Sequence, residues 1–389
     1  MRDSFILTGI LSILLSTGCT SFRSPYEPKQ TGSLKGTFKG DFTIGTAINT
    51  DQIREKDATG GKLITDNFDA VTPENIMKAE VIHPEWDRYD FSLSDKLVAY
   101  AQKNNLKVNG HTLIWHSQLP SFVRRMKDAD SVRQYFTNHI KTVASRYDGK
   151  LESWDVVNEA LEEDGSMRRS IFLEKLGDNF VVEAFRLARQ ASPNTKLYYN
   201  DYNIEEPAKR AGAIRLIKKI QDAGVHIDGV GIQGHWNVNY IPLKHIEDAI
   251  IEFAVLGIDV AFTELDLSVL PNPRNTIGAD VDQNAEYDAK LNPYTGGLPD
   301  SVQKKLTVGY ESLFRLFMKH SDKIGRVTLW GVHDGQSWLN NWPVMGRTNY
   351  PLLFDRQLKP KPAFYKIIKI KENYSVNNQS HQKNARINQ

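Results

Sequence analysis

Trp154-Asp155-Val156-Val157-Asn158-Glu159 is an apolar, strand-like run that ends on a carboxylate, and Val260-Ala261-Phe262-Thr263-Glu264-Leu265-Asp266 repeats the pattern about a hundred residues later. An apolar strand seldom ends on an unpaired acid, because burying an ionised carboxylate costs several kcal/mol. When two strands of one sheet end in this way, the simplest physical explanation is that the acids work as a pair. The two segments therefore predict two carboxyl groups held at the same end of a sheet.

Short β-rich runs alternate with segments of helical periodicity over most of the chain. Eight strands are predicted, at Phe42–Ala47, Asn67–Val71, Leu106–His111, Ser153–Asn158, Lys196–Asn200, Gly229–Gln233, Asp259–Glu264 and Arg326–Trp330. Helical patterns lie between them, most clearly at Ser92–Lys103, Ser131–Tyr147, Ile171–Gln190, Pro207–Ala223, Leu243–Ala254 and Val302–His320. This alternation indicates a parallel sheet. Eight such units fit a single α/β domain of the (β/α)8 barrel type, with its cleft at the C-terminal ends of the strands.

A doubly wound open sheet is the alternative, but no Gly-rich phosphate loop follows the first predicted strand. In a barrel, Glu159 ends the fourth strand and Glu264 the seventh, so the two side chains would face each other across the mouth. Cleavage of a glycosidic bond needs such a pair, in which one carboxyl group gives a proton and one carboxylate meets the sugar cation. Carboxyl groups about 5–5.5 Å apart imply retention of configuration, and a gap of about 6.5–9.5 Å implies inversion. For either glutamate alone, an ordinary ion pair at a strand end is an equal alternative.

The overall composition is that of an ordinary globular protein. The 389 residues carry a formal charge of +2, from 49 basic and 47 acidic side chains, with no basic block that would indicate a nucleic-acid partner. A single cysteine, Cys19, excludes an intramolecular disulfide and a Cys-based zinc site.

The N-terminus predicts export. Arg2 precedes an apolar run from Phe5 to Leu15, which is too short to span a bilayer and is typical of a secretion signal. Leu15-Ser16-Thr17-Gly18-Cys19 resembles a lipoprotein cleavage box, so residues 1–19 are predicted to be a signal peptide and Cys19 to carry lipid. The protein would then be an outer-membrane-anchored lipoprotein; a secreted or periplasmic location is the alternative. Residues 20–34 read as a tether, 35–374 as the catalytic domain, and 375–389 as a polar, disordered tail.

The acid-bearing segments resemble the two catalytic signatures of glycoside hydrolase family ten, the retaining endo-β-1,4-xylanases. Further motifs of that family follow in order, at Thr72–Lys78, Gly110–Gln118, Gly231–Trp236 and Trp330–Asp334. The resemblance runs from roughly Ser33 to Tyr374. It implies endo-acting double-displacement hydrolysis of β-1,4-xylosidic bonds, with xylan and xylo-oligosaccharides as partners. It also implies a monomer that needs no cofactor and no metal.

The resemblance assigns roles to five residues around the reacting bond. Glu159 would be the general acid/base, with a pKa raised by apolar surroundings and by the charge of Glu264. Glu264 would be the nucleophile and needs donors that keep it ionised. His235 would be one of them, with Asp266 on its other ring nitrogen. Asn158 would hydrogen-bond the 2-hydroxyl of the sugar under attack.

Other residues are predicted to bind sugar. The resemblance places His111 and Lys78 on the hydroxyls of the reacting sugar, and Glu74, Asn75 and Gln118 on the next sugar outward. The cleft walls and floor would be Trp115, Trp330 and Trp338, and the leaving-side contacts would be Gln233 and Tyr202. Bulky Trp338 would crowd the position where glucose carries its C6 hydroxymethyl group. For each residue a purely structural role is the alternative. The His111–Thr112 peptide bond is expected to be cis.

Three rival functions share this sequence pattern. A metal-dependent hydrolase could recruit His111, His116, His235, Asp266 and His333, although no His-x-His or His-Glu-x-x-His motif is present. A non-catalytic carbohydrate-binding protein would not need both glutamates. A β-1,4-glucanase shares the acid and the nucleophile but not the patterns at 110–118 and 330–338. The long connection Leu267–Pro299 contains no convincing helix and is expected to lie over the site face, where it could close one end of the groove.

Overall fold

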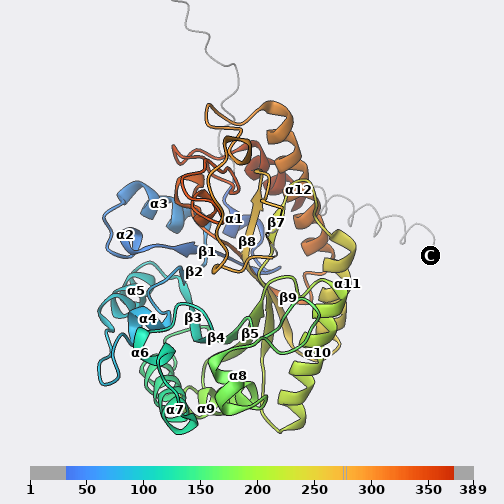
Figure 1. The fold of residues 1–389 in the computed structure, drawn as a ribbon. Helices are drawn as coiled ribbons and strands as arrows, with labels where there is room; N and C mark the ends of the chain where they lie inside the picture. Colours follow the sequence, from blue (N-terminus) through green and yellow to red (C-terminus); the bar gives the residue numbers. More distant parts are fainter. Residues whose placement is uncertain (1–31, 275, 277, 372–389) are drawn as a thin grey trace, which may run out of the picture. The chain divides into compact units, whose positions relative to one another are not determined.

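Eight parallel strands close into a barrel in the computed structural model, which describes residues 32–274, 276 and 278–371 (Figure 1). The barrel strands are β1 Thr43–Ile48, β2 Ala70–Pro73, β3 Lys107–Trp115, β4 Ser153–Asn158, β5 Lys196–Asp201, β6 Gly229–Ile232, β8 Asp259–Ser268 and β9 Ile324–Leu329. Each strand pairs with the next, and the ring closes through parallel β6–β8 and β1–β9 pairs. A ninth strand, β7 His235–Asn237, pairs only with the far end of β8, at Asp266 to Ser268. The predicted (β/α)8 barrel is confirmed.

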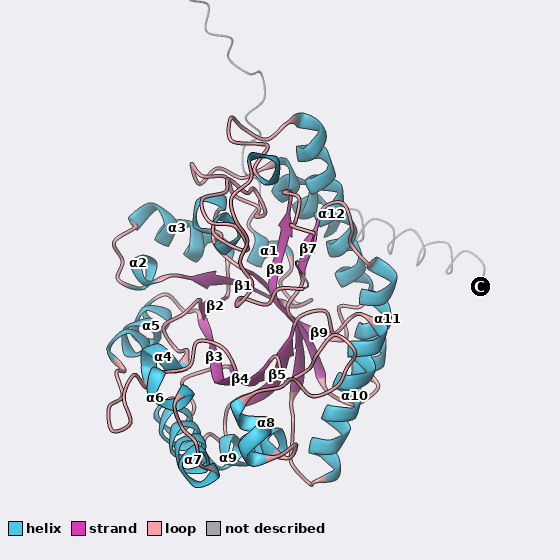
Figure 2. Cartoon of the chain, in the orientation of Figure 1, coloured by secondary structure: helices cyan, strands magenta, loops and turns pink. Residues whose placement is uncertain are grey.

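Helices surround this ring of strands, as Figure 2 shows. They are α1 Leu34–Thr37, α2 Thr50–Ile53, α3 Ala58–Asn67, α4 Ala79–Ile82, α5 Ser92–Lys103, α6 Ser121–Arg124, α7 Ala129–Arg146, α8 Ile171–Leu176, α9 Phe180–Ala191, α10 Pro207–Asp222, α11 Leu243–Ala254, α12 Asp300–Lys319 and a last helix at 362–371. Short 3-10 turns are η1 Ala289–Leu291, η2 Asp334–Gln336 and η3 Trp338–Asn340. The long helices alternate with the strands, which is the arrangement that the sequence predicted.

Two local differences from the expected elements have clear causes. The helical pattern 171–190 is divided, because Gly177 adopts a φ of 78° and ends α8. Asn67, expected in the second strand, instead ends α3, where its side chain donates to the Leu63 carbonyl. The sequence analysis missed α3 because Gly60 and Gly61 lower its helix propensity. Asp57 nevertheless caps it by accepting from the Gly60 N–H at 2.8 Å.

The layer between the barrel strands and the surrounding helices is packed with large aromatic side chains. Trp154 on β4 is fully buried and lies against Gly110 of the neighbouring strand β3. A Cβ at Gly110 would lie 2.2 Å from the indole, so only glycine leaves room for this ring. The acid-bearing strand β4 is thereby fixed against β3.

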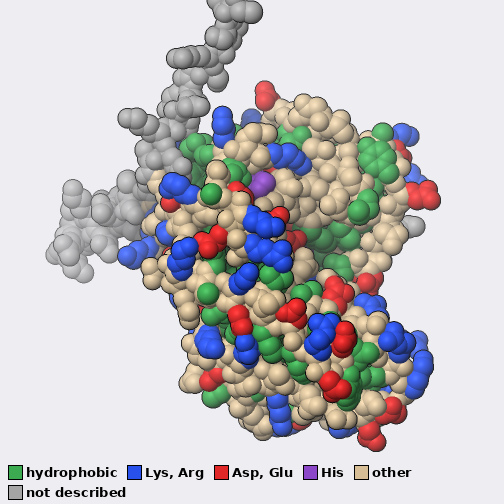
Figure 3. Space-filling view, turned by 90° about the vertical axis from the view of Figure 1, so that its left-hand side faces the viewer, with side chains coloured by type: hydrophobic (Ala, Val, Ile, Leu, Met, Phe, Trp, Pro, Cys, Tyr) green, Lys and Arg blue, Asp and Glu red, His purple; other side chains and the backbone are tan. Residues whose placement is uncertain are grey.

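The folded part begins slightly earlier than predicted. Ser33 caps α1 by accepting from the Gly36 N–H, and Leu34, assigned to the tether, is fully buried. The predicted signal peptide with Cys19, most of the tether, and the tail 375–389 lie outside the described residues. Within the described part, no helix has the length and apolar character needed to cross a bilayer. On the face in Figure 3, basic and acidic side chains are interspersed.

Candidate active site

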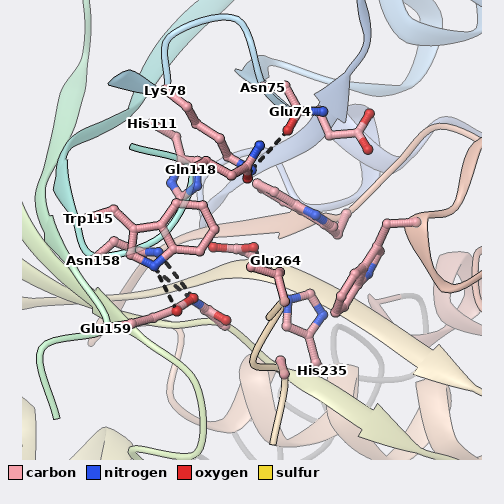
Figure 4. A pocket seen from close by; sticks show the side chains of 15 residues that line it. Glu74, Asn75, Lys78, His111, Trp115, Gln118, Asn158, Glu159, His235 and Glu264 are labelled. Carbon is pink, nitrogen blue, oxygen red and sulfur yellow. Dashed lines mark hydrogen bonds and ion pairs between the residues drawn. The ribbon is translucent and has the colours of Figure 1, made fainter. Parts of the chain in front are cut away.

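A pocket opens at the carboxyl ends of the strands, where the barrel mouth collects the predicted site residues (Figure 4). Its lining comes from six of the eight barrel strands or the segments after them, from β7, and from the connection that follows β8. It comprises Glu74, Asn75, Lys78, His111, Trp115, Gln118, Asn158, Glu159, Gln233, His235, Glu264, Ala279, Val281, Trp330 and Trp338. Of the predicted site residues, Tyr202 and Asp266 are not in this lining.

Glu159 directly follows β4 and is almost fully buried. Its backbone is left-handed, with a φ of 56°, a conformation that costs a non-glycine residue roughly 1–2 kcal/mol and concentrates at functional sites. Three side chains donate to its carboxylate: Trp115 Nε1 to Oε2 at 2.8 Å, and Asn158 Nδ2 and Gln233 Nε2 to Oε1 at 3.1 and 2.9 Å. Burial raises the pKa of Glu159, and the charge of Glu264 adds to the rise; the donors only partly offset it. Such a carboxyl group is suited to hold a proton.

Glu264 lies within β8 and is buried, yet its environment has the opposite effect. Burial alone would raise the pKa of its carboxyl group, but the hydrogen bond from His235 and the charges of His111 and His235 outweigh burial and lower it. His235 Nε2 lies 3.3 Å from Oε2, and Asn200 Nδ2 donates to Oε1 at 2.8 Å. The two buried glutamates are therefore tuned apart, one toward the protonated and one toward the ionised form.

His235 is held between two carboxylates, as the sequence predicted. Its Nδ1 lies 3.1 Å from Asp266 Oδ1, and Trp338 Nε1 donates to the other oxygen of Asp266 at 2.8 Å. Burial acts to lower the pKa of His235, but Asp266 and Glu264 together raise it well above its ordinary value. The imidazole is thus kept as a cation beside Glu264, and Asp266 supports the site from behind the pocket lining.

Asn200 is the main site residue that the sequence analysis missed. It lies in β5, paired with Asn158 of β4, and its Nδ2 reaches both Asn158 Oδ1 at 2.9 Å and Glu264 Oε1. Thr263 Oγ1 donates to Asn200 Oδ1 at 2.6 Å and fixes the amide orientation. Asn200 therefore connects the two glutamates through one hydrogen-bond chain. Its place at the end of a predicted strand, level with Asn158, was the available signal.

A cluster of polar side chains lies on the side of the pocket that follows β2. Lys78 Nζ donates to Asn75 Oδ1 at 3.0 Å and to Gln118 Oε1 at 2.8 Å. Burial lowers the pKa of Lys78 and raises that of Glu74, while the surrounding glutamates, Glu264 foremost, act to keep Lys78 charged. The structure brings the residues predicted to hold the outer sugar, Glu74, Asn75 and Gln118, to one side of the pocket (Figure 4).

The predicted tryptophans line the pocket, but they differ in what holds them. Trp115 is fixed by its bond to Glu159 and carries Lys78 Nζ 4.9 Å from its ring centroid. Trp330 packs edge-on against His111, with centroids 5.5 Å apart. Trp338 stacks on Trp342 at 4.5 Å, a partner that the sequence analysis did not single out. The pocket is therefore walled by rings that are themselves rigidly supported.

Tyr202 follows β5 but lies beneath the lining. Its hydroxyl accepts a hydrogen bond from Arg168 Nη2, and Lys209 Nζ lies 3.6 Å from its ring centroid. A Cβ at Gly278 would be 2.3 Å from its ring, so the backbone of the β8–α12 connection covers it. The predicted leaving-side contact of Tyr202 with sugar stays a prediction, whereas Gln233 reaches the pocket and bonds Glu159.

Behind Glu159 lies a buried charge network that the sequence analysis also missed. Asp201 and Lys209 are both fully buried and form an ion pair of 3.0 Å. Tyr199 Oη donates to Asp201 Oδ2 at 2.5 Å and accepts from the Ala160 N–H at 3.2 Å. The backbone immediately after the acid is therefore fixed to β5.

Three of the four histidines proposed for a metal hydrolase, His111, His235 and His333, have other partners. His111 Nδ1 lies 2.9 Å from Asp155 Oδ2, and the His111–Thr112 peptide bond is cis, as expected. His333 Nδ1 accepts from the Gly335 N–H, and His235 faces carboxylates on both sides. Among the described residues, one group has atoms close enough to share a cation, namely His116, Asp280 and Asp282. Arg168 already lies 3.7 Å from Asp280, so a cationic group is in place there.

Comparisons with known proteins agree with this geometry. The model of Glycosyl hydrolase family 10 matches residues 33–370. An endo-1,4-beta-xylanase A from Xylanibacter ruminicola is 46% identical over 338 residues, covering 85% of this chain and 91% of that protein. A beta-1,4-xylanase from Dictyoglomus thermophilum is 39% identical over 371 residues, covering 95% and 99%.

Solved structures show the same fold. An endoxylanase of this family retrieved from a sugarcane soil metagenome superposes with a TM-score of 0.83 at 41% identity, covering 87% of this chain and 100% of that one. Xylanase 10B from Thermotoga petrophila, in complex with xylobiose, gives a TM-score of 0.78 at 30% identity, covering 89% and 99%. The family resemblance of the motifs is thereby confirmed, and the chain belongs to glycosyl hydrolase family 10.

Proposed function

We propose that this protein is an endo-β-1,4-xylanase that cleaves xylan with retention of configuration, with Glu159 as general acid/base and Glu264 as nucleophile. The observation that carries the proposal is the opposite tuning of two buried glutamates in one pocket: burial raises the pKa of Glu159, and the bonds and charges around Glu264 lower its pKa. The substrate is taken from the xylanase names of the relatives and the xylobiose bound to a structural neighbour.

In the first step, Glu264 attacks the anomeric carbon, and Glu159 gives its proton to the departing glycosidic oxygen. The proton resides on a carboxyl group whose pKa burial raises, and the attacking oxygen is kept ionised by His235 and Asn200. As the covalent bond to Glu264 forms, its negative charge is lost. The repulsion that kept Glu159 protonated then disappears, so its pKa falls and it can act as a base.

In the second step, Glu159 takes a proton from water, which attacks the same carbon from the opposite face and releases Glu264. Trp115, Asn158 and Gln233 donate to the carboxylate of Glu159 and therefore stabilise the ionised form that this step needs. The same three donors orient both oxygens, so one geometry serves both proton transfers.

The pocket walls around the predicted outer-sugar position favour xylose over glucose on steric grounds. Trp338 and the side chains of Glu74 and Asn75 line the same pocket and leave little room for a C6 hydroxymethyl group. A group of this size is worth only about 1–3 kcal/mol, so weak activity on aryl cellobiosides is expected. Comparing xylan with carboxymethyl-cellulose separates this proposal from a β-1,4-glucanase, which would prefer the latter.

The decisive experiment combines stereochemistry with two alanine variants. NMR of the anomer first released from xylohexaose should show the β form, and a first-formed α anomer would overturn retention. Glu264→Ala should lose at least about a thousandfold in kcat. Azide added to this variant should yield an α-xylosyl azide, because azide replaces the missing nucleophile. With Glu159→Ala it should yield the β product, because azide then attacks the covalent intermediate; exchanged products would reverse the assignment.

We also propose that the protein is exported and anchored by lipid on Cys19, supported by the apolar run and the Gly18-Cys19 pattern. Expression of the full chain in a Gram-negative host should place it in the outer-membrane fraction. Cys19→Ala should move it out of that fraction, and an unchanged distribution would refute the anchor.

A further inference from the structure

The connection between β8 and α12 crosses the mouth of the pocket, and its described residues contact both walls. Ala279 and Val281 contribute to the pocket lining together with Glu74 and Trp330 on the far side. Ala279 is buried, and its neighbours Gly278, Asp280 and Val281 are half-buried. Residues 278–282, here named the strap, therefore form part of the site itself.

One end of the strap is held by the wall that carries the acid. Ser117, two residues after β3, donates to Asp282 Oδ1 at 3.0 Å, and Arg168 Nη1 lies 3.7 Å from Asp280 Oδ2. Gly278 rests on the Tyr202 ring, and its φ of 59° together with the missing Cβ makes this approach possible. The strap thus contacts residues from the segments that follow β3, β4 and β5.

The opposite wall holds the strap as well. Trp342, in the segment after β9, donates its indole N–H to the Asp280 carbonyl at 3.0 Å, and Ala285 N–H donates to the Pro343 carbonyl at 2.7 Å. Because Trp342 stacks on Trp338, the strap is joined to the aromatic wall of the pocket. Contacts to both walls make the strap a roof over the cleft.

The strap lies over the side of the pocket that carries Glu159. Arg168, which pairs with Asp280, lies close enough to Glu159 for its charge to act on the pKa of that carboxyl group. Burial raises the pKa of the neighbouring Tyr202, and the nearby charge of Glu159 adds to that rise. The outer-sugar residue Glu74 lies at the other end, with Lys78. Since the acid protonates the departing oxygen, the roofed end is where the leaving chain must pass.

We propose that the strap is a specificity determinant that selects against xylan substituted beside the scissile bond on the leaving side, an inference that rests on the proposed function. A covered passage accepts an unbranched chain of pyranose rings, whereas a glucuronosyl branch on a xylose collides with the roof. The Ser117–Asp282 bond and the Arg168–Asp280 pair act as the latch, and weakening them lets the strap lift. Lifting the strap also uncovers Tyr202.

The test compares variants of the full-length protein on two substrates. Asp282→Ala and Ser117→Ala each break the same latch bond from opposite sides, and Glu286→Ala removes an exposed acid from the same connection as a matched control. The ratio of kcat/KM on glucuronoxylan to that on xylohexaose should rise about fivefold in both latch variants, the factor that one net hydrogen bond of about 1 kcal/mol provides. It should stay unchanged in the control.

The outcomes separate this inference from the function on which it rests. Should both latch variants keep the ratio of the control while the unmodified protein hydrolyses both substrates, the strap is no determinant and the xylanase proposal stands. Should the unmodified protein hydrolyse neither substrate, both proposals fall. Product analysis of glucuronoxylan digests gives a second readout: the latch variants should release shorter branched fragments, and identical fragments would overturn the inference.

Discussion

Replacing Trp115 by Phe tests the electrostatics of the acid without removing the acid. The indole Nε1 donates to Glu159 Oε2 at 2.8 Å, and both residues are buried, so solvent does not weaken this bond. A hydrogen bond to a charged group contributes about 1.5–3 kcal/mol, and this one favours the ionised carboxylate. Phenylalanine keeps the aromatic wall but removes the donor. The protonated form of Glu159 should therefore gain by a factor of roughly ten to a hundred.

The assay is the pH dependence of kcat/KM on xylohexaose. Activity falls at alkaline pH when Glu159 loses its proton, so the alkaline limb of the profile should move to higher pH by about one unit or more in Trp115→Phe. The acidic limb, which reports Glu264, should move much less because Trp115 does not bond that residue.

Trp338→Phe is the matched control for this prediction. Its indole donates to Asp266 at the same distance of 2.8 Å, so the same chemical change is made in the same pocket without touching Glu159. Lost packing in the control is expected to alter KM, but the alkaline limb of its profile should stay in place. An unmoved limb in Trp115→Phe, or equal movement in both variants, would refute the account of how the acid is tuned.

Three further predictions concern the nucleophile, the buried ion pair behind the acid, and the absence of a metal requirement. His235→Ala removes a donor that keeps Glu264 ionised, so the pKa of Glu264 rises and the acidic limb of kcat/KM should move to higher pH; an unchanged limb would contradict this role. Lys209→Met leaves Asp201 buried without its cation and should cost about 3–5 kcal/mol in urea unfolding followed by tryptophan fluorescence. The exposed ion pair between Lys62 and Asp66 serves as the control, because Lys62→Met should lower the free energy of unfolding by at most about 0.5 kcal/mol. Equal losses of stability in the two variants would count against the role of the buried pair. Finally, EDTA treatment should leave xylohexaose hydrolysis unchanged, whereas a metal hydrolase would be inactivated.

The barrel could be predicted because its signals are local and repeated. Apolar strands alternate with amphipathic helices, and α5 and α11 have the bounds that their periodicity indicates. Elements that are stabilised by caps or tertiary contacts could not be predicted from hydrophobic periodicity alone. The helix α3 contains two glycines and is fixed by Asp57, a contact that periodicity does not reveal.

The pocket residues that could be predicted from the sequence are those in motifs at the ends of predicted strands. Glu159 directly follows β4 as predicted, whereas β8 continues past Glu264, where it was expected to end, to Ser268, and His235 begins β7. All three lie at the barrel mouth, where the carboxyl ends of parallel strands meet. Asn200 and Arg168 were missed because their importance depends on partners more than thirty residues away in the sequence. The covering of Tyr202 could not be foreseen either, since the path of the connection after β8 is set by tertiary contacts.

The assignment of Glu264 is tested most directly by trapping the covalent intermediate. A 2-deoxy-2-fluoro-β-xylobioside with a good leaving group slows the second step more than the first, so the glycosylated enzyme accumulates. Digestion and mass spectrometry should then find one added 2-deoxy-2-fluoroxylobiosyl group, two sugar rings, on the peptide that contains Glu264, and none in Glu264→Ala. A label on another carboxylate, or inhibition without any covalent adduct, would contradict the central claim that Glu264 attacks the sugar while Glu159 protonates the leaving oxygen.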